Sequence, residues 1–95
     1  MVQEKYLQQV KGIIDAFSFT KDCQIFLFGS SIQKERFGDL DLGIQGLVAE
    51  KEISKLKEAF KNSNLPYNVD VINFDEVSEE FKNNVFNNKI IWIKP

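Results

Sequence analysis

Hydrophobic residues recur at regular spacings along most of the chain, and these spacings predict where its helices lie. Apolar side chains three or four positions apart predict an amphipathic helix over residues 2–17. The same spacing predicts a helix over residues 48–62 and a last helix over about 76–87. Residues 18–22 are expected to form a loop, and the polar residues 30–37 a short helix or a loop.

Three shorter segments between these helices have the features of β-strands. Residues 23–28 are mostly apolar and end at Gly29, which is typical of a buried strand. Residues 39–44 alternate strictly between polar and apolar side chains, and residues 67–72 continue this alternation. The apolar residues 90–93 are expected to form a final strand or tail on the chain's own core. A surface for a partner or for a homodimer is the second interpretation of this tail.

The element order α-β-α-β-α-β-α predicts an α+β fold, in which helices pack on a β-sheet in two layers. At 95 residues the chain is expected to form one domain, residues 1–95, with one modest core. Nine Phe residues suggest a core of large side chains, and an apolar patch for a partner is the alternative.

Composition excludes several classes of chemistry. The net charge of −2, from 12 basic and 14 acidic residues, disfavours a sequence-independent nucleic-acid binder. With no His and one Cys, the chain has no intramolecular disulfide, no His/Cys zinc site and no His-based triad. Cys23 is interpreted as a small core residue rather than a nucleophile. Charges near the N-terminus and the lack of about 18 consecutive apolar residues predict a cytoplasmic protein without a membrane span.

Three aspartates are the main candidates for chemistry. Asp39 and Asp41 lie two positions apart in a predicted strand, so their carboxylates are expected to point to the same face. Asp70 lies in the middle of the next predicted strand and would join them if the two strands are neighbours. Such repelling carboxylates are suitable ligands for a hard divalent cation such as Mg²⁺. The alternative is a set of solvated residues on an exposed sheet face, although aspartate is depleted from strands.

Gly29 and Ser30 directly follow the first predicted strand. A glycine at such a position lets the backbone approach a phosphate, and the N–H groups and hydroxyl that follow can donate hydrogen bonds to it. Taken alone, a Gly-Ser pair after a strand is most simply a turn. Its position eight residues before the aspartate pair gives the phosphate-binding hypothesis its weight.

In combination, these motifs resemble the signature of the minimal nucleotidyltransferases of the DNA polymerase beta-like superfamily. That signature is a strand, Gly-Ser, a short helix, Asp-x-Asp on a second strand and a third Asp on a later strand. The resemblance covers residues 25–72 by motif, and it implies the nucleotidyltransferase fold, with a small mixed sheet and helices packed on one face. The matching segments are Phe28-Gly29-Ser30, Asp39-Leu40-Asp41-Leu42 and Val69-Asp70-Val71.

The resemblance also implies residue roles and substrates. Asp39, Asp41 and Asp70 would be the catalytic residues and the ligands of Mg²⁺, while Gly29 and Ser30 would hold the β- and γ-phosphates of a nucleoside triphosphate. The implied reaction is transfer of a nucleoside monophosphate, most plausibly AMP from ATP, to a hydroxyl group. The family's Ser before the first Asp is replaced here by a glycine, and the segment after Gly-Ser departs from the family pattern as well. In that segment Lys34 and Arg36 are candidates either for the triphosphate or for solvated helix charges.

Minimal members of this superfamily are often paired with a helical HEPN-domain protein in toxin–antitoxin systems. The resemblance therefore implies an antitoxin that adds AMP to a hydroxyl of such a partner. The alternative is a non-catalytic binding module of the same fold that neutralises its partner by occlusion. A third class, an enzyme acting on RNA ends or on a small molecule, is disfavoured by the acidic balance and by the lack of a second domain.

Overall fold

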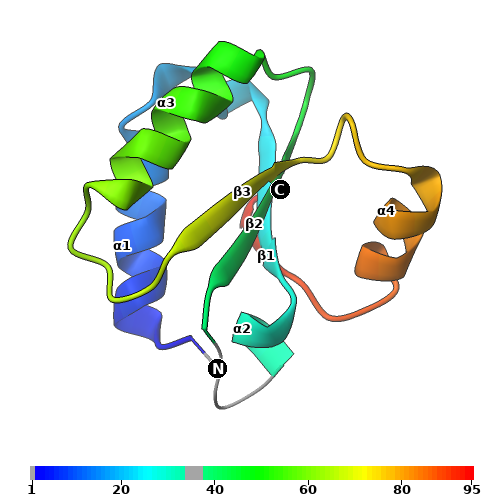
Figure 1. Cartoon of the computed structure of the whole chain (residues 1–95), viewed down its shortest axis with the longest axis horizontal. Coiled ribbons are helices and arrows are strands. Elements are labelled where there is room, and N and C mark those ends of the chain that lie inside the picture. Colours follow the sequence, from blue (N-terminus) through cyan, green and yellow to red (C-terminus); the bar gives the residue numbers. More distant parts are fainter. Residues whose placement is uncertain (1, 34–37) are drawn as a thin grey trace.

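A four-stranded β-sheet with the strand order β3-β2-β1-β4 lies at the centre of the computed structural model, which describes residues 2–33 and 38–95 (Figure 1). The elements, in chain order, are α1 (Glu4–Asp15), the 3₁₀ helix η1 (Ser18–Asp22), β1 (Gln24–Phe28), α2 (Ser30–Gln33), β2 (Leu40–Gln45), α3 (Glu50–Lys61), β3 (Val69–Asn73), α4 (Glu79–Phe86) and β4 (Ile91–Lys94). β1 pairs antiparallel with β2 and with β4, whereas β2 and β3 are parallel. The sheet is therefore mixed, and the predicted α+β fold class is confirmed.

The observed elements follow the predicted ones with shorter ends. The final apolar segment is a strand, β4, so the first interpretation of residues 90–93 is confirmed. Residues 18–22 form η1 instead of a loop, because Thr20 is fully buried there. The hydroxyl of Thr20 lies 3.0 Å from the carbonyl oxygen of Ile14 and 2.7 Å from that of Phe17. No helix within the described ranges is long and apolar enough to cross a membrane.

Helices α1 and α3 cover one face of the sheet (Figure 1). Because side chains alternate along a strand, Leu40, Leu42 and Ile44 of β2 all point to this face and are fully buried there. Ile25 and Leu27 of β1 lie beside them. This layer forms the larger part of the core. It leaves the intervening positions of the same strands on the opposite face.

An aromatic cluster occupies part of the opposite face. The Phe26 ring centroid lies 4.8 Å from that of Phe74, 5.1 Å from that of Phe86 and 5.2 Å from that of Trp92. A Cβ atom on Gly43 would overlap the rings of Phe26 and Phe74, so glycine is what lets the rings lie across β2. Since α4 contributes Phe86 here, the predicted one-face arrangement holds for α1 and α3 but not for α4.

Cys23 lies just before β1 and is buried. Its Sγ atom donates a hydrogen bond to the carbonyl oxygen of Phe19 at 3.3 Å. Burial, followed by the negative charges of Asp22 and Asp75, raises the pKa of the thiol. A buried thiol with a raised pKa is a poor nucleophile, which supports its interpretation as a core residue.

Candidate functional site

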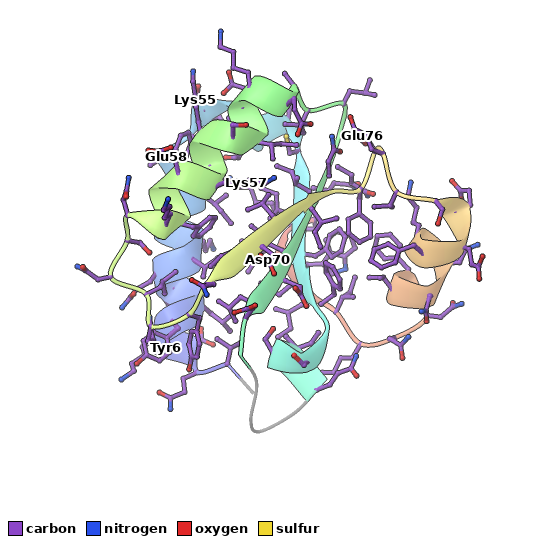
Figure 2. The ribbon with its side chains drawn as sticks, in the orientation of Figure 1. Tyr6, Lys55, Lys57, Glu58, Asp70 and Glu76 are labelled. Carbon is purple, nitrogen blue, oxygen red and sulfur yellow. The ribbon has the colours of Figure 1, made fainter. Side chains whose placement is uncertain are left out.

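Two of the three predicted aspartates occupy matching positions on neighbouring strands. Asp41 of β2 and Asp70 of β3 are register partners in the parallel pair. Their neighbours in the register, Leu40 with Val69 and Leu42 with Val71, point to the opposite face, where they pack in the core under α1 and α3. The two carboxylates therefore share the face that carries the aromatic cluster. Figure 2 shows Asp70 on β3, which is an edge strand of the sheet.

Asp39 was predicted within the second strand but lies one residue before β2 begins. Its side chain is exposed, whereas Asp41 is half-buried. Burial raises the pKa of Asp41 most, and the negative charges of Asp70 and then Asp39 raise it further. The third carboxylate thus acts electrostatically on Asp41 even though it lies outside the strand. A charged Asp41 is held in repulsive surroundings, which a bound cation would relieve.

Gly29 ends β1 in a conformation that ordinary residues rarely adopt, with φ at +84°. A Cβ atom at this position would lie 2.6 Å from Oδ2 of Asp41. The backbone turn that leads into Ser30 therefore lies directly against the Asp41 carboxylate. This turn is closed by a hydrogen bond from the N–H of Ile32 to the carbonyl oxygen of Gly29, at 3.3 Å. The predicted Gly-Ser element and the predicted aspartates thus meet in one place.

A cavity of about 170 Å³ adjoins the Gly29 turn on the side of α4. Its polar lining includes Asn84 and Asn88, together with Lys89, from the end of α4 and the segment after it. These residues could not be predicted from the sequence, because pairs of asparagines and an isolated lysine have no spacing that points to a site. Lys34 and Arg36, the predicted triphosphate candidates, lie outside the described residues.

A larger cavity, of about 460 Å³, adjoins Asp70 at the β3 edge of the sheet. Asp70 and Gly38 line it, together with Lys57 and Lys61 of α3. The site therefore extends across three strands. The small cavity lies beside Gly29, just after β1, Asp41 lies on β2, and the larger cavity lies beside Asp70 at the β3 edge.

The carboxylates of the site suit Mg²⁺, although they do not form a complete set of metal ligands by themselves. Within residues 2–33 and 38–95, no three acidic, histidine or cysteine side chains are grouped so that they could hold a metal ion by themselves. Mg²⁺ is usually held by one or two carboxylates together with substrate phosphates rather than by protein ligands alone. Asp41 and Asp70, beside a backbone turn that can approach a phosphate, fit that mode of binding.

Gly-Ser after a first strand, with aspartates on the two strands beside it in a mixed sheet, defines a domain of the nucleotidyltransferase type. Over 88 aligned residues the chain is 31% identical to the probable protein adenylyltransferase MntA of Haemophilus influenzae. This match covers 85% of the chain and 73% of that protein. The chain belongs to the nucleotidyltransferase family of this relative. No model of a known protein family matches the sequence.

Proposed function

We propose that this protein is a Mg²⁺-dependent nucleotidyltransferase that transfers AMP from ATP to a hydroxyl group on an acceptor protein. The observation that carries the proposal is the register pairing of Asp41 with Asp70, with Gly29 packed against the Asp41 carboxylate. The relative's name, probable protein adenylyltransferase, supports protein as the class of acceptor and AMP as the transferred group.

In this proposal the aspartates hold Mg²⁺ jointly with the triphosphate. Asp39 and Asp41 would supply the first ligands, and Asp70 would complete the set. A bound Mg²⁺ would neutralise negative charge on the triphosphate and on the leaving pyrophosphate. Burial, together with repulsion from Asp70 and Asp39, raises the pKa of Asp41, and a nearby cation would favour the charged form of this carboxylate.

The chain's own residues would position the two reacting groups. The backbone after Gly29 and the hydroxyl of Ser30 would donate hydrogen bonds to the β- and γ-phosphates, and Lys89 would add positive charge beside them. Asp70, in its alternative role to that of a metal ligand, would take the proton from the acceptor hydroxyl. The acceptor oxygen would then bond to the α-phosphorus, the bond from that phosphorus to its bridging oxygen would break, and pyrophosphate would leave.

Calorimetric titration with ATP and with a non-hydrolysable ATP analogue, with and without Mg²⁺, tests the nucleotide site. The wild type is expected to bind either nucleotide in a Mg²⁺-dependent manner. Asp41→Asn is expected to bind at least about tenfold more weakly, since it removes a charged ligand. Asp75→Asn is the matched control, because the carboxylate it removes accepts hydrogen bonds from the loop before α3 and does not line the cavities beside Gly29 and Asp70.

Equal Mg²⁺-dependent binding by wild type and Asp41→Asn would remove the basis of this proposal. A wild type that binds no nucleotide would favour the non-catalytic module that acts by occlusion. The helical HEPN-type partner and the homodimer stay predictions. The HEPN-type partner is tested directly by looking for transfer of labelled AMP to a helical protein that co-purifies with this chain.

A further inference from the structure

We propose that the cavity beside Asp70 is the acceptor site of this enzyme, and that Lys57 and Lys61 select an acidic protein segment that carries the acceptor hydroxyl. This inference rests on the proposed function, since it assigns the second substrate of the same site. It concerns a part of the molecule that the aspartate motifs do not include.

The direction of attack follows from the order of the site across the sheet. Gly29 at the end of β1 lies against Asp41 of β2, and Asp41 is paired with Asp70 of β3. In an in-line displacement the entering and leaving oxygens lie on opposite sides of the phosphorus. If the pyrophosphate leaves toward Gly29, the acceptor hydroxyl must enter from the side of Asp70.

That side of the site is hollow and carries positive charge. The residues that line the cavity of about 460 Å³ include Asp70, Lys57 and Lys61. A second cavity, of about 470 Å³, continues along β3 and is also lined by Lys57 and Asp70. Figure 2 shows Lys57 projecting from α3 toward β3, whereas Lys55 and Glu58 project away from it.

Neither of these two lysines forms an ion pair within the described part of the chain. The ion pairs there join Lys55 to Glu52 and Lys94 to Asp15, and neither includes Lys57 or Lys61. Two free cations at the mouth of a cavity attract an anionic group and raise its local concentration. If carboxylates flank the acceptor hydroxyl, they would contact Lys57 and Lys61 while the hydroxyl lies beside Asp70.

A protein segment fits this surface better than RNA, which also carries hydroxyls beside negative charges. The lysines of α3 alternate with Glu50, Glu52 and Glu58, so the helix has no continuous basic stripe. The chain as a whole has a net charge of −2. A nucleic-acid site normally has a basic excess that follows the phosphate backbone.

Label transfer from α-³²P-ATP to defined acceptors tests the inference. The acceptors are a random copolymer of glutamate and tyrosine, a random copolymer of lysine and tyrosine, and an oligoribonucleotide with a free 3′ hydroxyl. The test variant is Lys57→Glu/Lys61→Glu. Its matched control, Lys51→Glu/Lys55→Glu, makes the same change of charge on the same helix but outside the cavity. Lys57→Gln/Lys61→Gln is a second, milder variant, and thermal unfolding checks that each one folds.

The wild type is expected to label the glutamate–tyrosine copolymer about tenfold faster than the lysine–tyrosine copolymer. Lys57→Glu/Lys61→Glu should lose about tenfold on the acidic copolymer through a higher KM, and the control should change by less than about twofold. Added salt should reduce the wild-type preference, because exposed charges are screened. A purely structural role for the lysines would not produce this salt dependence.

Several results would overturn the acceptor assignment. These are an equal loss in the control variant, labelling of the oligoribonucleotide alone, and no labelling of the acidic copolymer. Calorimetric titration of the same preparations with Mg·ATP separates failure of the acceptor assignment from failure of the proposed function. Wild-type binding of Mg·ATP without preference for the acidic copolymer rejects only the acceptor assignment, whereas no binding of Mg·ATP rejects both.

Discussion

Gly29 and Asp41 lie so close together that a Cβ atom on the first would be 2.6 Å from Oδ2 of the second. The contact joins the end of β1 to the carboxylate on β2, and it needs both the missing side chain and the φ of +84° at Gly29. The shape of the turn and the position of the carboxylate therefore depend on each other. A substitution at either residue is therefore expected to affect both stability and nucleotide binding.

Gly29→Ala is expected to reduce both stability and nucleotide binding. A side chain at positive φ that also meets Asp41 should lower the free energy of unfolding by about 1–3 kcal/mol. Urea unfolding and calorimetry with Mg·ATP measure the two effects. Gly12→Ala is the control, because nothing lies within 4 Å of its Cβ position and Gly12 lies inside α1. That change should instead raise the free energy of unfolding by about 0.5–1 kcal/mol. Equal behaviour of the two variants would rule out a special role for Gly29.

Asp41→Asn is expected to stabilise the protein in the absence of metal and nucleotide. Burial, with the charges of Asp70 and Asp39, raises the pKa of Asp41 above its ordinary value of 3.8, so the folded state binds this proton more tightly than the unfolded chain. The charged carboxylate therefore lowers the free energy of unfolding. This loss is absent below the ordinary pKa and develops as pH rises through the raised pKa of the folded state. Urea unfolding at neutral pH and below pH 3.8 should show a higher free energy of unfolding for the variant only at neutral pH. A variant that is less stable than the wild type at neutral pH would contradict the prediction.

Lys89→Gln is expected to weaken Mg·ATP binding without altering stability. Lys89 lines the cavity beside Gly29, so removal of its charge should raise Kd about three- to tenfold. The effect is modest because the side chain is exposed to solvent. Lys21→Gln serves as the control, since this exposed lysine of η1 precedes the opposite end of β1 from Gly29. If both variants bind Mg·ATP as tightly as the wild type, Lys89 has no part in the triphosphate site.

Asp75→Asn is expected to destabilise the protein without changing nucleotide affinity. Its carboxylate accepts hydrogen bonds from the N–H groups of Gly46, Leu47 and Val48 at 3.1, 2.7 and 3.2 Å. Although burial raises the pKa of Asp75, these donors outweigh it and hold the pKa below its ordinary value. The stability they provide is present above pH 3.8 and is lost as pH falls through the lowered pKa. At neutral pH the variant should lose about 1 kcal/mol in urea unfolding. An increase in stability would show that these hydrogen bonds do not hold the loop.

Much of the fold could be predicted because the alternation of side chains is strong where one face is buried. The alternation of Leu40, Leu42 and Ile44 with polar or small residues placed β2 to within one residue. The position of α4 was missed, since an apolar helix face does not reveal which side of a sheet it covers. The aromatic cluster that α4 joins needs a residue without a side chain at Gly43, because a Cβ atom there would overlap the rings of Phe26 and Phe74.

The candidate site could be predicted only in part. The motif spacing identified Asp41, Asp70 and Gly29, which the structure brings together. Asp75 was missed as a structural residue, because its partners are backbone N–H groups that carry no signature in the sequence. The role proposed for Lys57 and Lys61 of α3 was missed, because periodicity alone could not show that they border a cavity beside β3.

The pairing of Asp41 with Asp70 also protects the sheet against misassembly. If β3 slipped by one residue along β2, each of its side chains would exchange faces. Asp70 would then enter the apolar layer under α3, while Val69 or Val71 would replace it beside Asp41. Burying an unpaired carboxylate costs several kcal/mol. Asp70, the proposed catalytic aspartate, thus also penalises every odd-numbered shift of β3 along β2.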